Sequence, residues 1–423
     1  MAAVGKMYSD GHLNIIATEQ EKGVESVRYG ILHNPEESSM RINRVLDKLQ
    51  RKPAVAPLEI TSLFVGLAGR SLRSISTDVD IALPEDTEIT SDIVDNLRNK
   101  ALSTAIDSSL EVIDAIPRSY MVGKRETRSP KGEIGSRISA TYDLIVCRKE
   151  LQRNLNRTLV DKVGVDIAGL VVTPLSTAQV LLTSEEKRLG CMLVDMGAET
   201  TTVSIYKDGS LRYLATLPLG GRNITRDITT LNLLEERAED IKTNNGNAMA
   251  REAGGQNMKD YRMSDVNNLI VARSEEIVAN IVEQLKYADM KDSDLPAGLI
   301  CIGGGSKLNG MLDLLSKQTS LTVRRGQLPE YIRLEEIKAP TVEALQVSSV
   351  LYSGASVSDA VCLEEPQGES LPVTGEGYEE EPEQHEVKHR QKGKDGSKLL
   401  NKWRTNIAKF FSAPEEDDSD LIE

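Results

Sequence analysis

Two glycine-rich turns, each directly after an apolar segment, constrain the possible folds of this chain more than any other sequence feature. The segment 191–206, CMLVDMGAETTTVSIY, predicts a buried strand, a tight turn and a second strand. The segment 299–306, LICIGGGS, predicts another buried strand that ends in three glycines, before a helix over 311–316. Either turn alone is a weak signal, but together they favour a protein of two lobes that close on a nucleotide.

The residue types in both turns suit phosphate chemistry. Backbone N–H groups and Thr hydroxyls in a tight turn can bind phosphate, and a carboxylate beside them can hold Mg²⁺ through water. Glycines between a strand and a helix let the backbone approach a nucleotide closely. The simpler interpretation is structural: Gly197 only makes the hairpin turn, and Asp195 caps it. The predicted contacts in these turns are Asp195 (also the Mg²⁺ residue), Gly197, Thr200, Thr201, Gly303, Gly304, Gly305 and Ser306.

Composition narrows the class of protein. Apolar strands alternate with helical patterns up to about Cys362, which is typical of α/β proteins, and 423 residues suffice for at least two domains. The net charge of −14 argues against general nucleic-acid binding, which needs a basic face. The four cysteines lie far apart without metal-ligand spacing, so we expect reduced, mostly buried thiols. No stretch reaches about 18 consecutive apolar residues and no signal peptide is evident, so any membrane contact is expected to be peripheral.

Periodicity predicts the remaining elements of the folded part. A helix from Thr90, its N-cap, to about Ile106 and an exposed, charged loop over 124–136 are expected. The long segment 264–289 predicts a helix with one buried stripe, formed by Val266, Leu269, Ile270, Ile277, Ile281 and Leu285. Further strands are predicted at 63–65, 79–83, 112–116, 138–147 and 167–172, and a further helix at 148–163.

The amino-acid composition of the sequence changes after Cys362. Residues 364–386 contain nine acidic residues and no Lys or Arg, together with three prolines, so this stretch cannot bury enough apolar surface to fold. We therefore predict a disordered acidic linker over 364–396 and an acidic tail over 412–423.

Between the linker and the tail, residues 397–411 form a predicted amphipathic helix. Six apolar side chains fall within an arc of about 120°, and lysines cluster on the opposite side. The only Trp and two of the three Phe of the chain lie here, which favours a helix in the surface of an anionic membrane. The alternative is a helix that docks on the protein body or on a partner protein. The predicted lipid contacts are Lys398, Leu399, Leu400, Lys402, Trp403, Arg404, Ile407, Lys409, Phe410 and Phe411.

The order of these features resembles the actin and sugar-kinase superfamily and, within it, the FtsA family of bacterial cell-division proteins. The turn at Asp195 looks like the family's second phosphate motif, and LICIGGGSKLNGM from Leu299 looks like its adenosine motif. Residues 219–221 resemble the entry to the smaller subdomain of the second lobe. The segment 235–242 resembles the helix that reaches the ribose side, which implies nucleotide contacts for Glu235 and Lys242.

The sequence also departs from the family pattern. The family's first phosphate motif, an Asp-x-Gly turn on the opening strand, is missing, and residues 1–16 resemble the strand that follows it. In the second phosphate motif, Ala198, Glu199 and Thr202 stand where Gly, Gly and Asp are frequent. The carboxylate of Glu199 could repel phosphate or assist the metal.

The resemblance implies a two-lobed actin-like α/β fold with an inserted α+β subdomain. The implied first-lobe segments are 1–60, its core, the inserted subdomain 61–168, and 169–190, its return with the interlobe helix. The implied second-lobe segments are 191–222, the core with the phosphate hairpin, the smaller subdomain 223–296, and 297–363, with the adenosine motif.

The resemblance further implies a tether rather than an enzyme, with at most weak ATPase activity. Such a protein would bind ATP or ADP with Mg²⁺, assemble with itself, and fasten FtsZ filaments to the cytoplasmic face of the membrane at the division septum, beside other division proteins. Its smaller subdomain, 223–296, would receive the FtsZ C-terminal tail. The alternatives are another actin-fold ATPase or small-molecule kinase, or a PilM-type assembly protein.

Overall fold

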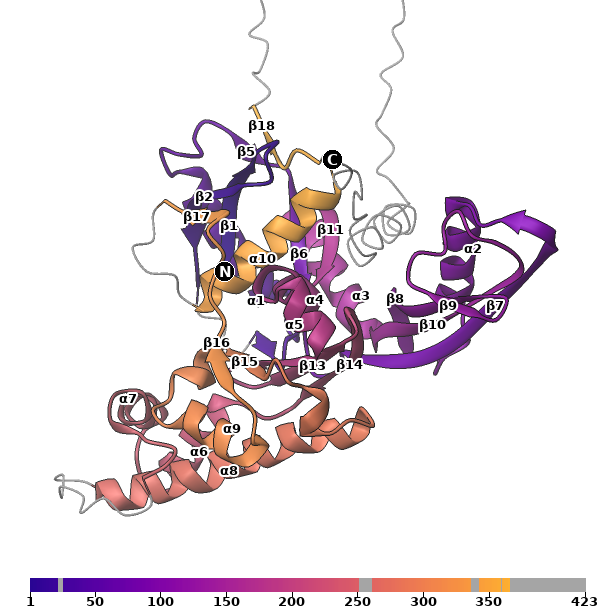
Figure 1. The fold of residues 1–423 in the computed structure, drawn as a ribbon. Helices are drawn as coiled ribbons and strands as arrows, with labels where there is room; N and C mark the ends of the chain where they lie inside the picture. The colour runs from indigo at the N-terminus through magenta and orange to yellow at the C-terminus, as the bar shows by residue number, and fades with distance from the viewer. Residues whose placement is uncertain (22–25, 251–260, 336–341, 359, 366–423) are drawn as a thin grey trace, which may run out of the picture.

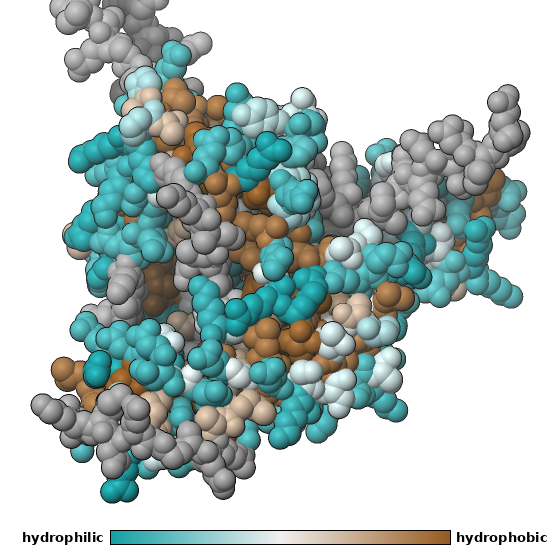
Figure 2. Space-filling view, turned by 60° about the vertical axis from the view of Figure 1, so that its left-hand side comes forward, coloured by the Kyte–Doolittle hydropathy of each residue, from teal (hydrophilic) through white to brown (hydrophobic). Residues whose placement is uncertain are grey.

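A computed structural model describes residues 1–21, 26–250, 261–335, 342–358 and 360–365. Figure 1 shows an upper lobe around β1, β2 and α10, a lower lobe that contains α6 to α9, and a third part, β7 to β10 with α2, that projects to one side. Hydrophilic residues cover most of the face seen in Figure 2, whereas hydrophobic residues gather in its middle, where the lobes meet.

The first lobe is built on a hairpin that a distant strand completes. Its sheet has the order β1 (Ala2–Met7), β2 (Leu13–Glu19) and β17 (Ile332–Leu334), with β17 parallel to β2. Helix α1 (Pro35–Gln50) packs against this sheet, because Val45, Leu46 and Leu49 repeat at helical spacing and face the core. Asn34 accepts hydrogen bonds from the first-turn N–H groups of α1 and so caps it.

A second layer of the first lobe contains a parallel pair of strands, β6 (Ser62–Leu67) and β11 (Asp166–Val172). Helices α4 (Thr173–Leu181) and α10 (Val342–Val357) pack together beside this pair. Helix α3 (Lys149–Thr158) continues into a π-helical turn, Leu159–Val163, so the predicted helix over 148–163 is confirmed. The small elements are β3 (Val27–Arg28), β4 (Ile31–Leu32), β5 (Glu59–Ile60) and α5 (Ser184–Leu189).

The second lobe is a sheet covered by helices. Strands β12 (Cys191–Met196), β13 (Thr201–Lys207) and β14 (Ser210–Leu217) form an antiparallel meander. Strand β15 (Leu299–Ile302) runs parallel to β12, and β16 (Val323–Arg325) runs parallel to β15. The strands predicted on either side of Gly197 and before Gly303 are therefore confirmed as neighbours in one sheet.

Helices α6 (Gly221–Thr229), α7 (Glu235–Asn245), α8 (Met263–Tyr287) and α9 (Met311–Thr319) share a hydrophobic core with the second-lobe sheet. Helix α8 confirms the helix predicted over 264–289. Of its predicted stripe, Val266, Ile270, Ile277, Ile281 and Leu285 are buried, and Leu269 is half-buried. Short 3-10 turns lie at Asp292–Asp294 and Gly304–Lys307.

The projecting part continues the second-lobe sheet in the order β14-β7-β10-β8-β9. Its strands are β7 (Arg73–Glu88), β8 (Leu110–Val122), β9 (Arg125–Thr127) and β10 (Ile134–Arg148), and α2 (Ser91–Leu102) packs on them through Leu97 and Ala101. One ladder pair, Ala215 with Arg73, joins it to β14, and side chains add to this contact: the Ser74 hydroxyl accepts from the Leu214 N–H, and Arg118 donates to the Arg212 carbonyl oxygen. Its first and last strands also meet, since Arg73 pairs with Val146.

One predicted element in this part is wrong. Residues 124–136 do not form only an exposed loop, because β9 pairs with β8 and β10 begins at Ile134. A tight turn at Gly123, whose φ is +60°, brings Arg125 opposite Val122 and thereby creates the short edge strand. The N-cap at Thr90 is confirmed, with its hydroxyl accepting from the Ile93 N–H.

The described part of the chain ends just inside the predicted acidic linker. Glu364, the first residue assigned to that linker, lies instead in β18 (Leu363–Glu364), which pairs with β5. The rest of the linker, the amphipathic helix over 397–411 and the tail over 412–423 lie outside the described residues. All four cysteines are free, and three of them are buried. Within the described ranges, no helix has the length and apolar character needed to cross a membrane.

Candidate nucleotide site between the lobes

The glycine turns predicted from sequence meet at the end of β12. A Cβ atom on Gly303 would lie 2.3 Å from the Met196 carbonyl oxygen, and one on Gly220 would lie 2.6 Å from the Ala198 carbonyl oxygen. Gly303 also has a φ of +88°, which side chains other than hydrogen rarely allow. Glycine is therefore required at positions 220 and 303 for the turns at Gly197, Gly220 and Gly303 to pack together. We call the place where these three turns meet the interlobe site.

Asp195 lies at the centre of the interlobe site. Its Oδ2 accepts a hydrogen bond of 2.5 Å from Nε2 of Gln346, a residue of α10 in the first lobe. Its Oδ1 is buried and has no hydrogen-bond partner. Burial raises the pKa of Asp195 from its ordinary value of 3.8 to about 6, against the opposing effect of the Gln346 hydrogen bond. A buried carboxylate oxygen without a partner is costly unless a ligand completes it.

The threonines of the hairpin turn differ in their burial and in their hydrogen bonds. The Thr201 hydroxyl donates to the Leu219 carbonyl oxygen at 2.8 Å, and this side chain is fully buried. Thr200 is half-buried, and its carbonyl oxygen accepts from the Gly197 N–H at 2.8 Å, which closes the turn. Thr202, at the position where the family frequently has Asp, faces the Thr216 hydroxyl within the sheet at 3.1 Å.

The second predicted turn presents an open backbone. Gly304 is exposed, and a Cβ atom added to it would meet no atom within 4 Å. Gly305, by contrast, packs on Met196, with 3.1 Å from its virtual Cβ to the Met196 carbonyl oxygen. The Ser306 hydroxyl is buried and donates to the Gly303 carbonyl oxygen at 2.8 Å, which fixes the shape of the turn.

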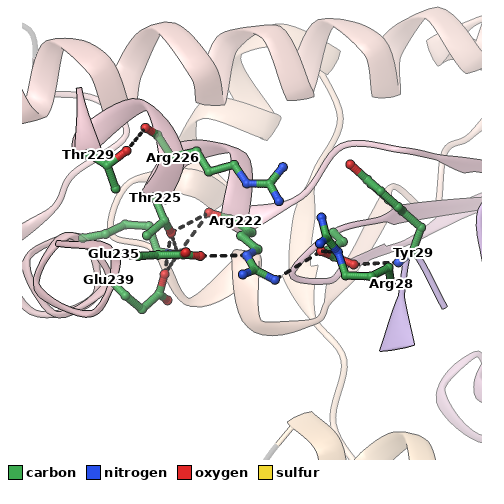
Figure 3. A network of polar contacts seen from close by, with 11 residues as sticks. Arg28, Tyr29, Arg222, Thr225, Arg226, Thr229, Glu235 and Glu239 are labelled. Carbon is green, nitrogen blue, oxygen red and sulfur yellow. Dashed lines mark hydrogen bonds and ion pairs between the residues drawn. The ribbon is translucent and has the colours of Figure 1, made fainter. Parts of the chain in front are cut away.

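The two residues predicted on α7, Glu235 and Lys242, are engaged with other protein groups, and Figure 3 shows Glu235 beside Arg222. The Lys242 ammonium donates to the Gly221 carbonyl oxygen at 3.1 Å, to the Thr225 hydroxyl at 3.0 Å and to Glu239 at 2.7 Å. Because a lysine has three donors, a ribose contact would have to replace one of these bonds. Glu235 accepts from Arg222 at 2.8 Å, and this hydrogen bond holds the pKa of Glu235 below its ordinary value.

Glu199, one of the departures from the family pattern, contacts both lobes. Its Oε1 lies 2.9 Å from Nε of Arg28 and 3.3 Å from Nη1 of Arg222, and its Oε2 accepts from the Tyr29 N–H at 2.6 Å. Arg28, Tyr29, Arg222 and Gln346 were not predicted as site residues. The basic character of the two arginines was visible in the sequence, but no local pattern linked either of them to the hairpin turn.

The interlobe site fits a nucleotide with a divalent cation. The partnerless Oδ1 of Asp195 offers a hard oxygen, and the open face of Gly304 leaves backbone accessible. Among the described residues, no group of three or more His, Cys, Asp or Glu side chains could hold a metal ion. A cation beside Asp195 would therefore need most of its ligands from phosphate oxygens and water.

Comparison with known proteins identifies the family. The family profile described as Cell division protein FtsA matches residues 192–344, and the profile described as SHS2 domain inserted in FTSA matches residues 69–146. Cell division protein FtsA of Porphyromonas gingivalis is 34% identical over 326 residues, which cover 74% of this chain and 67% of that protein. The chain belongs to the FtsA family.

Other similarities extend this FtsA assignment. Cell division protein FtsA of Pseudomonas aeruginosa is 27% identical over 407 residues, covering 93% of this chain and 94% of that protein. Among solved structures, a chain of the PilM-PilN type IV pilus biogenesis complex has a TM-score of 0.56 at 15% identity, covering 83% of this chain and 94% of that one. At this identity the likeness concerns the fold alone. The predicted two-lobed actin-like fold with an inserted α+β subdomain is confirmed, and this FtsA-family chain is a cell-division protein.

Proposed function

We propose that this FtsA-family chain anchors FtsZ filaments to the cytoplasmic face of the membrane at the division septum. Family membership supports the role in division. The observation that carries the tether is the sequence of segment 397–411, where the only Trp and two of the three Phe would share one face of the predicted helix, opposite lysines. An acidic linker in front of it would keep the body away from anionic lipid by charge repulsion.

Co-sedimentation with anionic liposomes tests the membrane contact. The full chain should pellet with the vesicles, and a chain that ends at Gly396 should stay in the supernatant. Trp403→Glu and Phe410→Glu should release the protein, because each places a charge among the apolar side chains. Thr405→Glu is the matched control, since on a helical wheel it adds the same charge opposite the apolar arc. Equal pelleting of the full and shortened chains would contradict the tether.

A second arm of the same experiment tests the partner. FtsZ should pellet with liposomes only when the full chain is present. It should bind the chain ending at Gly396 in solution, since the proposed receiving region, residues 223–296, is intact there. We propose in addition that the chain assembles with itself and meets other division proteins at this place. If FtsZ fails to bind either chain, the role as an FtsZ anchor fails.

We further propose that the interlobe site binds ATP or ADP with Mg²⁺. Asp195 would hold the cation through water, the turn at Gly197 and Thr200 would face phosphate, and Gly303 to Ser306 would lie on the adenosine side, with Glu235 and Lys242 toward the ribose. The partnerless Asp195 oxygen and the open face of Gly304 support this arrangement. Titration with fluorescent ADP should give saturable binding that weakens for Gly304→Val, which fills the open space. Unchanged affinity in this variant would contradict the placement.

A further inference from the structure

Glu199 is the internal anion of a polar network that joins the two lobes, and Figure 3 shows its partners Arg28, Tyr29 and Arg222. Its carboxylate contacts Arg28 and the Tyr29 N–H from the first lobe and Arg222 from the second. Its side chain is only 14% exposed, whereas the side chains of Arg28 and Arg222 are 35% and 20% exposed. The donors are therefore partly open to solvent, although the carboxylate between them is largely shielded.

The backbone at Tyr29 is shaped to present its N–H. Tyr29 and Gly30 form the two-residue turn of the β3–β4 hairpin, with φ values of +51° and +75°. Turns with two positive φ values favour Asn and Gly, and a bulky residue there costs roughly 1–2 kcal/mol. No residue other than glycine fits at position 30, because a Cβ atom there would lie 2.6 Å from the Gly69 Cα. Strain of this kind often marks functional positions.

Positive charge accumulates around this turn. The guanidinium carbons of Arg28 and Arg70 lie 5.9 Å and 5.4 Å from the centre of the Tyr29 ring. Arg222 also contacts Glu235 through Nε, which leaves its Nη1 directed at Glu199. Two guanidinium groups and a backbone N–H, converging from two lobes on one carboxylate, are the donors that proteins use for phosphate.

We propose that Arg28, the Tyr29 N–H and Arg222 form an anion site shared by the two lobes, which Glu199 occupies as an internal ligand. A phosphate group, free or at the end of a nucleotide, would compete with this carboxylate for the same donors. The site lies outside the predicted nucleotide motifs except for Glu199 itself. Only its nucleotide form depends on the nucleotide binding proposed above, and its free-phosphate form does not.

Removal of the internal ligand should expose the site. Titration calorimetry with inorganic phosphate, against sodium chloride of equal ionic strength, compares the wild-type chain with Glu199→Ala. If the carboxylate fills the site about nine-tenths of the time, the apparent Kd for phosphate should fall about tenfold in the variant. Adding Arg28→Ala to Glu199→Ala should abolish this gain. Glu276→Ala is the matched control, because it removes a carboxylate from an arginine pair on α8, away from the site.

Measuring the binding of ADP and ATP to the same two chains separates the proposed anion site from the proposed nucleotide site. Tighter phosphate binding by Glu199→Ala, with no binding of ADP or ATP to either chain, supports the anion site and counts against the nucleotide site. Nucleotide binding without any gain in phosphate affinity overturns the anion site. Glu199→Gln, which keeps the shape and removes the charge, is measured in parallel. If Glu199→Ala does not fold, an affinity for phosphate in Glu199→Gln equal to wild type overturns the proposal in its place.

Discussion

The charge on Asp195 should make the stability of this chain depend on pH, and replacing it with Asn isolates that effect. Burial raises its pKa from 3.8 to about 6, so the folded chain binds a proton more tightly than the unfolded chain does. The stability associated with protonated Asp195 is thus fully present below about pH 4 and is lost as the pH rises through about 6. Asp195→Asn keeps the shape and cannot ionise, so it lacks this loss.

The magnitude follows from the two pKa values. Above pH 6 the penalty approaches about 3 kcal/mol in the free energy of unfolding, and at pH 5 it is about half as large. The Asn amide leaves an N–H₂ group at the position of the partnerless Oδ1, which costs about 1–3 kcal/mol at every pH. The sign of the difference at one pH is therefore not diagnostic. The change of this difference with pH is diagnostic: relative to wild type, Asp195→Asn should gain about 1–2 kcal/mol between pH 5 and pH 8.

Urea unfolding followed by circular dichroism at pH 5 and pH 8, without Mg²⁺ or nucleotide, measures this change. Tryptophan fluorescence is unsuitable, because the only Trp lies at position 403, in the predicted membrane segment. Gln346→Ala is the control: it removes the hydrogen bond that lowers the Asp195 pKa, so its pH dependence should be steeper than that of wild type. A difference between Asp195→Asn and wild type that is equal at both pH values would refute the reasoning.

Four further substitutions test the packing around this centre and in the inserted subdomain. Gly303→Ala should lower the free energy of unfolding by more than about 2 kcal/mol, because its Cβ would overlap a backbone oxygen at a φ of +88°. Gly304→Ala, which meets no atom within 4 Å, should cost less than about 1 kcal/mol, and equal losses in urea unfolding would contradict this contrast. Arg98→Ala leaves the buried Asp114 without its ion pair and should cost about 3–5 kcal/mol, seen as faster hydrogen exchange in α2 and β8. Arg137→Ala, which breaks an exposed pair, should cost less than about 1 kcal/mol, and similar exchange in the two variants would argue against a buried pair.

Local sequence patterns predicted the elements of the interlobe site well. Apolar runs next to Gly197 and Gly303 predicted β12, β13 and β15, because buried strands and their turns are encoded within a few residues. The same holds for α8, whose stripe repeats at helical spacing over 25 residues. The edge strand β9 was missed, since three charged or polar residues carry no alternation and pair only because Gly123 turns the chain.

The contacts that join the lobes could not be predicted in this way. Gln346 meets Asp195 across 151 positions, and Arg28 meets Glu199 across 171. No periodicity relates such positions, because each pair is created by the packing of whole lobes. Sequence comparison flagged Glu199 as unusual, but its partners emerge only from the arrangement in space.

The pairing of Arg73 with Val146 makes the projecting part, β7 to β10 with α2, a side branch of the chain. Facing residues of antiparallel strands have Cα atoms about 5 Å apart, so a short turn could bridge the branch point if the residues between them were removed. On the second-lobe side the attachment consists of one ladder pair, Ala215 with Arg73, and of the hydrogen bonds that Ser74 and Arg118 form with β14. In evolutionary terms, such a branch can be gained, lengthened or exchanged in one genetic event while the path of the two lobes is preserved.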